Sequence, residues 1–163
     1  MTQPCEHSHD RQAGLSGPGL VRELEAARRL CATRGERLTR PRERVLELLL
    51  QASGPLKAYD LLAGIAGGAG KAGPPTVYRA LDFLAAQGLV HRIESLNAFV
   101  ACRHPGGHNA AFLICDCCGA TREFDPGEAR TLAEEARRDG FALSAVTLEA
   151  HGLCADCQSA PQA

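Results

Sequence analysis

The 163-residue chain lacks tryptophan altogether, and aromatic residues make up only 4% of it. Apolar residues nevertheless amount to 45%, so a packed core is possible, and that core must be aliphatic, built from leucine, alanine and valine. No apolar run approaches the roughly 20 residues that a membrane helix requires. The N-terminal MTQPCEHSHD has neither a basic nor an apolar region, which excludes a secretory signal. We therefore expect a cytoplasmic protein with no membrane partner.

A net positive charge is also missing, because the formal net charge is −1. The charges are unevenly distributed, however. Residues 21–96 carry 12 Lys/Arg and 8 Asp/Glu, whereas residues 97–163 carry 5 and 9. This asymmetry is typical of a chain whose first half binds nucleic acid and whose second half does not, although solvated charged faces give the same pattern.

Metal-binding side chains are abundant in one stretch. Residues 91–123 hold three of the six histidines and four of the eight cysteines. In a cytoplasmic protein, cysteines in such numbers indicate metal or redox chemistry more than a disulfide framework. Residues 1–18 are predicted to be a disordered tail. Its Cys5, His7 and His9 could bind a metal, but the simpler interpretation is a disordered tail in which these residues bind nothing.

Four helices and a β-hairpin are predicted in the first half. The helices cover about 18–32, from Thr39 and Pro41 onward, 58–66, and from Pro75 to a stop at Gly88. The strands cover 89–93 and 98–101, with a turn at 95–97. This order predicts a winged helix-turn-helix DNA-binding domain at residues 19–101.

The fourth helix would read DNA. Tyr78 and Arg79 stand in its predicted first turn, off the apolar stripe. Arg79 can fork to the O6 and N7 atoms of a guanine, a contact worth ~1–3 kcal/mol of discrimination. Several arginines also lie near the start of the second helix. They either contact DNA phosphates or belong to a solvated, charge-rich turn. They are Arg34, Arg37, Arg40, Arg42 and Arg44. The alternative is another small helical domain in which Tyr78 and Arg79 are ordinary surface residues.

Residues 102–163 are predicted to form a small α/β domain, so that the whole chain is of the α+β class. A strand is expected at Phe112–Ile114, an amphipathic helix at Glu128–Gly140 with Leu132 inside, and a strand at Phe141–Glu149. Its aliphatic content is small for about 60 residues, and such a domain usually needs a metal or a partner chain.

Two CxxC knuckles lie in this half. They are Cys115-x2-Cys118 and Cys154-x2-Cys157, separated by 35 residues. Two knuckles complete a tetrahedral four-thiolate site of the kind that selects zinc or an iron–sulfur cluster, and a closed structural site favours zinc. Cys117 is a spare thiol between the first two ligands. His151 is expected to be a hydrogen-bonded neighbour of this site and not a ligand.

A second, mixed site is predicted from His91, Cys102, His108 and Glu123, with His104 as an alternative to His108. His91 begins the hairpin and Cys102 ends it, and the ends of paired strands come close. Nitrogen, sulfur and oxygen ligands together suit zinc. A site that ties the wing to the second domain would act as a sensor. The alternative is surface histidines beside a core cysteine.

Several segments together resemble the ferric uptake regulator family, and within it the branch of zinc uptake regulators. These segments are AYDLL (58–62), PPTVYRALDFL (74–84), QGLVHRIESLNAFVAC (87–102), FLICDCCGA (112–120), and GFAL with EAHGLCADC (140–157). The resemblance implies a homodimer in which residues 102–163 form the dimerisation domain. It assigns the four knuckle cysteines to structural zinc and His91, Cys102, His108 and Glu123 to regulatory zinc, two ions per subunit. It also places Tyr59, Tyr78 and Arg79 at DNA contacts.

The function implied is a zinc-responsive repressor that binds operator DNA and controls zinc-uptake genes. Iron-type relatives carry a His-His-Asp-His run where this chain reads His108-Asn109-Ala110-Ala111, which argues against an iron or peroxide sensor. A zinc-stabilised interaction module without DNA binding would leave Tyr78 and Arg79 unexplained. An enzyme of the zinc deaminase kind is excluded because the chain has no H-x-E and no proline before either knuckle.

Overall fold

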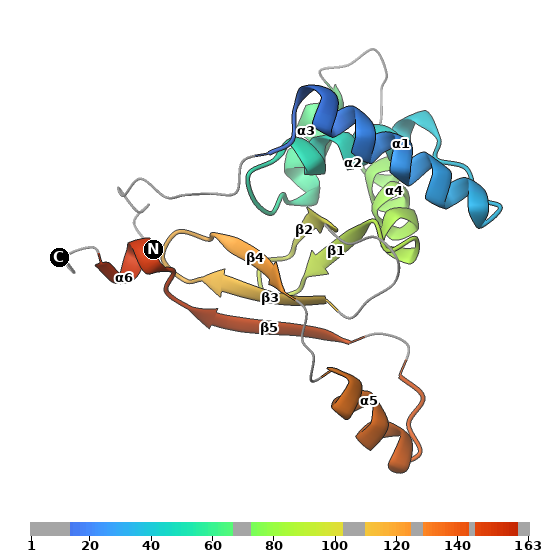
Figure 1. The fold of residues 1–163 in the computed structure, drawn as a ribbon. Helices are drawn as coiled ribbons and strands as arrows, with labels where there is room; N and C mark the ends of the chain where they lie inside the picture. The colour runs from blue at the N-terminus through green and yellow to red at the C-terminus, as the bar shows by residue number, and fades with distance from the viewer. Residues whose placement is uncertain (1–13, 67–72, 103–109, 125–128, 144–145, 160–163) are drawn as a thin grey trace. The chain divides into compact units, whose positions relative to one another are not determined.

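A computed structural model describes residues 14–66, 73–102, 110–124, 129–143 and 146–159. These residues belong to two compact units, the first covering 14–102 and the second 110–159 (Figure 1). Within the described ranges, no helix has the length and apolar character needed to cross a bilayer.

The first unit contains the four predicted helices. They are α1 (Gly17–Thr33), α2 (Arg40–Gln51), α3 (Ala58–Ala66) and α4 (Pro74–Ala86). Three of them begin with a proline among their first two residues, where the missing N–H costs nothing. After α4 the chain turns at Gly88, whose φ of 65° is open to glycine but costly for other residues. The structure thus confirms the helical order predicted for the first half.

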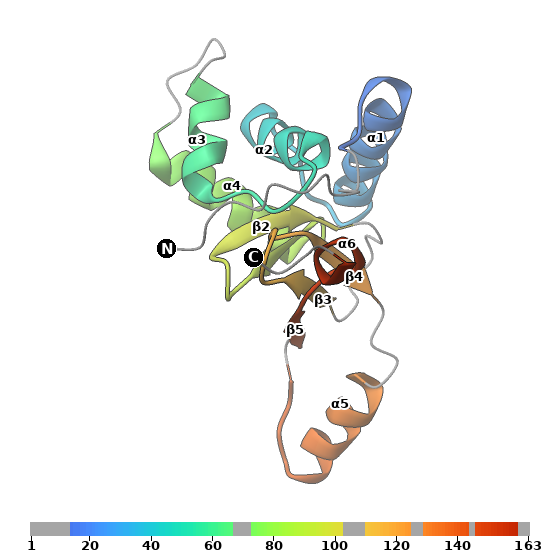
Figure 2. The same cartoon turned by 90° about the vertical axis from the view of Figure 1, so that its left-hand side faces the viewer.

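The core of the first unit is aliphatic, as the composition requires. Helix α2 contacts α1, α3 and α4 and is therefore central to the unit (Figure 2). The most deeply buried side chains include Val45, Leu46, Leu61, Val77, Leu81 and Leu84. Residues 77, 81 and 84 recur at helical spacing, so one face of α4 is held in the core and the opposite face is left outside.

A hairpin follows α4. Strand β1 (Val90–Ile93) pairs antiparallel with β2 (Ala98–Ala101), and Asn97 adopts a left-handed φ of 46° in the turn between them. Phe99 also exchanges backbone hydrogen bonds with Leu56, the N–O distances being 2.8 and 2.9 Å. This bridge ties the hairpin to the segment ahead of α3. The winged-helix arrangement predicted from sequence is confirmed.

The second unit is built on a mixed three-stranded sheet in the order β4-β3-β5. Strand β3 (Ala110–Cys115) is antiparallel to β4 (Thr121–Phe124) and parallel to β5 (Thr147–Gly152). Helix α5 (Ala129–Arg138) lies in the crossover that a parallel pair requires, and a short α6 (Ala155–Ser159) ends the described chain. The α+β class is confirmed.

Two sequence predictions for this unit were wrong. The strand expected at Phe141–Glu149 begins only at Thr147 and continues to Gly152, because pairing with β3 selects Thr147 opposite Ala110. Tertiary pairing here overrides the alternation of the sequence. Leu132, expected to be buried on α5, is 43% exposed. Strand β4 and helix α6 were not foreseen at all.

Candidate metal centres and DNA-binding helix

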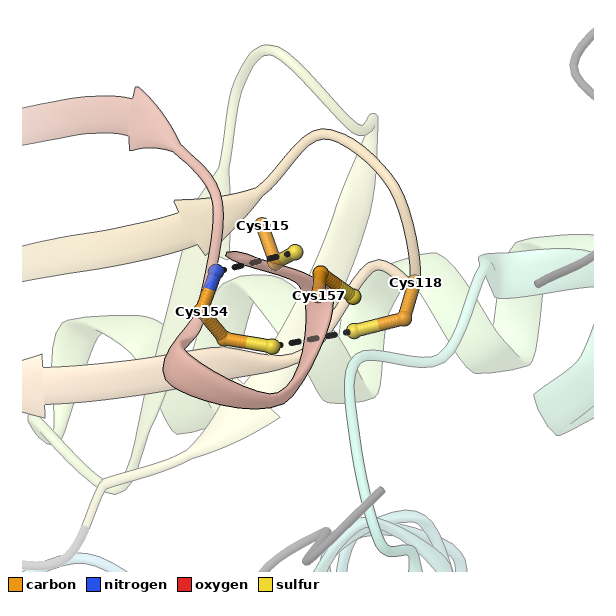
Figure 3. A group of neighbouring side chains, drawn as sticks. All are labelled: Cys115, Cys118, Cys154 and Cys157. Carbon is orange, nitrogen blue, oxygen red and sulfur yellow. Dashed lines mark hydrogen bonds between the residues drawn. The ribbon is translucent and has the colours of Figure 1, made fainter. Parts of the chain in front are cut away.

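The four knuckle cysteines come together at one end of the second unit's sheet. Cys115 ends β3 and Cys118 lies in the turn toward β4, while Cys154 follows β5 and Cys157 lies in α6. Because β3 and β5 are parallel and Cys115 pairs with Gly152, both knuckles emerge at the same edge. Figure 3 shows the four side chains pointing toward one another, and their sulfur atoms all lie within 4.8 Å.

The spacing of these sulfurs fits a zinc ion. Four sulfurs at ~2.3 Å from a tetrahedrally coordinated zinc would lie about 3.8 Å apart. The Sγ atoms of Cys118 and Cys154 are 3.8 Å apart. A closed set of four cysteines, with Cys115 and Cys157 buried, is typical of structural zinc sites and leaves no open position for a substrate. The chemistry of the donor set and its geometry therefore both fit zinc.

The backbone around the cluster favours one thiolate. Burial opposes the ionisation of Cys115, but N–H groups of Cys118, Cys154 and Cys117 together outweigh it and lower the pKa of Cys115 to about 6. The N–H of Cys154 lies 3.3 Å from the Cys115 sulfur. Burial raises the pKa values of Cys118 and Cys157. Three backbone donors aimed at one sulfur are what a bound anionic ligand requires.

Two neighbouring residues lie outside the ligand set. Cys117 is exposed and does not belong to the group of four. His151 is hydrogen-bonded to Asp116, with 2.9 Å between Nδ1 and Oδ1, as expected for a neighbour of the site. Asp116 was not predicted from the sequence. The sequence feature that could have indicated it is its position directly after Cys115, the first zinc ligand.

The proposed sensor ligands are distributed over both units. In the first unit, His91 lies on β1 and Cys102 follows β2, with its N–H bonded to the Leu89 carbonyl at 2.9 Å. The ligand atoms of His91 and Cys102 lie within 4.8 Å of each other, so the hairpin brings these two residues together. In the second unit, Glu123 lies on β4 opposite Phe112 and is partly buried. His104 and His108 lie outside the described residues.

The proposed DNA-reading side chains project from α3 and α4. Tyr78 is 54% exposed and Tyr59 is 79% exposed, and Arg79 is also exposed. Because α4 begins at Pro74 and not at Pro75, Tyr78 and Arg79 lie one residue further into the helix than the sequence suggested. Tyr59 and Tyr78 are the two tyrosines of the chain, and both lie on helices of the winged-helix unit with more than half of their surface exposed.

The arginines at the entry to α2 divide into two groups. Three of them contact other residues of the first unit. Arg34 donates to the Gln87 carbonyl at 2.7 Å, Arg42 stacks 3.4 Å over the Phe83 ring, and Arg44 pairs with Glu47 at 2.7 Å. Arg37 and Arg40 are exposed at the surface. Part of the basic cluster therefore stabilises the fold, and only the remainder is placed to meet a phosphate.

Comparison with known proteins agrees with this geometry. The ferric uptake regulator family matches residues 33–151 of the chain. The zinc uptake regulation protein of Escherichia coli (strain K12) is 45% identical over 137 residues, covering 82% of this chain and 80% of that protein. A solved zinc uptake regulator complexed with zinc and DNA is 43% identical, with a TM-score of 0.81 over 87% of this chain and 97% of its own. The crystal structure of holo XcZur is 48% identical, with a TM-score of 0.77 over 84% and 97% of the two chains.

Proposed function

Because the chain belongs to the ferric uptake regulator family, we propose that it is a zinc-responsive transcriptional repressor that controls zinc-uptake genes. It binds operator DNA as a homodimer when zinc is bound. The observation that carries this function is the likeness, over most of the chain, to a zinc uptake regulator solved with both zinc and DNA. Members of the family are transcription regulators, and the chain is not an enzyme. Its operator DNA lies in the cytoplasm, where we expect the protein to act.

Two zinc ions per subunit perform different tasks in this proposal. The first is structural and is held by Cys115, Cys118, Cys154 and Cys157, whose sulfurs already lie at the spacing of a tetrahedral site. The second is regulatory. Its ligands are His91 and Cys102 from the hairpin, Glu123 from the sheet of the second unit, and His108, with His104 as the alternative.

The regulatory site can act as a sensor because its ligands come from both halves of the chain. A ligand shifts a conformational equilibrium only by its difference in affinity for the two states. Zinc that needs His91, Cys102 and Glu123 together binds only the conformation in which they meet. It thereby favours one arrangement of the DNA-binding domain, residues 19–101, on the domain formed by residues 102–163. Residues 1–18 remain a tail without an assigned role.

The DNA contacts come from α3 and α4. Helix α4 enters the major groove, where Arg79 reads a guanine and Tyr78 contacts a phosphate or a thymine methyl group. Tyr59 on α3 supports this contact. Two subunits present two such helices to a two-fold operator. The sheet of the second unit supports dimerisation, because Leu113, Phe124 and Leu148 share one face by register and are each more than a third exposed.

The test is operator binding at controlled free zinc. The operator is first selected from a pool of random-sequence duplexes with the zinc-loaded protein. Binding is then measured against buffered zinc, with iron(II) and manganese(II) in parallel. We expect binding to switch on with zinc at concentrations where the four-cysteine site is already full. Binding that follows iron(II) and ignores zinc would instead assign the protein to the iron-sensing branch.

Two variants test the regulatory zinc site and the DNA contact separately. Glu123→Ala should require more zinc for DNA binding while keeping the four-cysteine zinc, because only the regulatory ligand set is shortened. Arg79→Ala should leave zinc binding unchanged and weaken binding to the selected operator. If no metal elicits DNA binding, the protein is a zinc-stabilised interaction module and the proposal is wrong.

A further inference from the structure

One side-chain contact beside the four-cysteine site has no role in the function proposed above. The Nδ1–H of His151 donates to Asp116 Oδ1 over 2.9 Å. Neither residue belongs to the metal-binding group. Asp116 lies inside the first knuckle, directly after Cys115, whereas His151 lies on β5 three residues before Cys154. The contact therefore joins the strand that leads into the second knuckle to the loop of the first.

The contact lies at the end of the parallel β3–β5 pair. The strand register ends with Cys115 opposite Gly152, and His151 is opposite Ile114. The backbone N–H of Asp116 donates to the Gly152 carbonyl over 2.8 Å, and its side chain reaches back along β5 to His151. On the other side of the ring, Nε2 of His151 lies 4.0 Å from a carboxylate oxygen of Glu149. A hydrogen bond to Asp116 thus orients the imidazole, and a second carboxylate lies near its other ring nitrogen.

Beyond the paired strands the two knuckles also meet directly. The N–H of Cys154 donates to the Cys115 sulfur over 3.3 Å. The sulfurs of Cys118 and Cys154 lie 3.8 Å apart. Zinc dissociates from such a site by losing its ligands one after another. A contact that keeps the two knuckles together after the first ligand has left favours rebinding over escape.

We propose that Asp116 and His151 are positioning residues that hold the two knuckles at the spacing of one zinc ion and slow its release. This inference rests on the structural zinc of the proposed function and adds a kinetic control to that site. Partners outside the ligand set commonly tune metal affinity by orienting the groups that bind. Here the oriented groups are whole knuckles, and the two residues act through the backbone ends of β3 and β5.

The experiment measures zinc release from the zinc-loaded full-length chain into an excess of a chromogenic chelator. The slow phase belongs to the four-cysteine site and is identified by its absence in Cys118→Ser. Asp116→Ala should accelerate this phase about two- to fivefold, the range that corresponds to an exposed pair of this kind. Asp116→Asn should restore much of the wild-type rate, because its amide oxygen still accepts from His151 Nδ1–H.

Two controls distinguish the contact from a general loss of charge or of structure. Asp156→Ala removes a carboxylate from between the two cysteines of the second knuckle and should leave the slow phase at the wild-type rate. Cobalt(II) loaded in place of zinc should give the same thiolate absorption bands in the Asp116, Asp156 and His151 variants, since all four cysteines remain in them. His151→Ala should accelerate release as Asp116→Ala does, and the double variant should be no faster than either single variant.

The inference is overturned by a wild-type release rate in Asp116→Ala, by equal acceleration in Asp156→Ala, or by additive effects in the double variant. A wild-type chain that takes up no zinc in the four-cysteine site would overturn this inference and the structural zinc together. A chain that holds zinc with these release rates but never binds DNA would overturn the repressor function alone.

Discussion

Replacement of Cys118 by serine is the most direct test of the idea that a metal holds the second unit together. Cys118 supplies one of the four sulfurs and lies 3.8 Å from the sulfur of Cys154. Serine retains the size of the side chain but is a poor ligand for zinc, since its hydroxyl is not ionised at neutral pH. The adjacent Cys117 offers a matched control, because it is exposed and lies outside the group of four.

The magnitude follows from how little apolar surface the second unit buries. The large apolar side chains that are nearly inaccessible in its described part are Phe112 and Ile114. Each contributes ~1.5–3 kcal/mol, or about 3–6 kcal/mol for the two together. A structural zinc contributes about 10–16 kcal/mol of apparent binding free energy. The metal is therefore the larger contribution, and a three-ligand site should leave the second unit largely unfolded.

Hydrogen exchange with mass spectrometry reports the two units separately. In Cys118→Ser we expect amides of β3 and β5 to lose their protection, while those of α2 and α4 keep it because the first unit has its own aliphatic core. Zinc content should fall by one ion per subunit. Cys117→Ser should retain both the zinc and the protection. Protected β3 and β5 amides in a zinc-free Cys118→Ser chain would refute the reasoning.

Three further results are expected. Zinc binding to the four-cysteine site at pH 7 should release fewer than four protons, because the pKa of Cys115 is lowered to about 6 and that thiol is already ionised. The number of protons released should rise as the pH falls below about 6. Calorimetry in buffers of different ionisation enthalpy measures this number. Leu84→Ala should lower the free energy of unfolding of the first unit by about 2–5 kcal/mol, since Leu84 is fully buried. Arg28→Ala should lower it far less despite the 2.6 Å pair with Glu43, because solvent screens that pair. Denaturant titration compares the two variants. Arg79→Ala should lose about 1–3 kcal/mol of discrimination between the selected operator and a duplex in which one guanine is replaced. Competition binding measures the ratio of the affinities for the two duplexes. An unchanged ratio in Arg79→Ala would refute base reading by this residue.

Local sequence rules account for the elements of the first half and for the identity of the four-cysteine site. Proline and glycine mark the ends of α4, and residues 77, 81 and 84 recur at the helical period, so local rules suffice there. The CxxC pairs are equally local, because two cysteines three residues apart can always turn toward one ion. The fold class and the winged-helix order followed from these short-range patterns.

Pairing between distant segments sets the course of the second unit. The strand that begins at Thr147 and not at Phe141 is chosen by its pairing with β3, a long-range partner that alternation in the sequence does not encode. The same register brings both knuckles to one edge and places His151 against Asp116. The arginines before α2 could not be sorted from sequence either, because stacking of Arg42 on Phe83 depends on how α2 and α4 pack. Short-range patterns determine which residues can act, and the register of distant segments determines which of them meet.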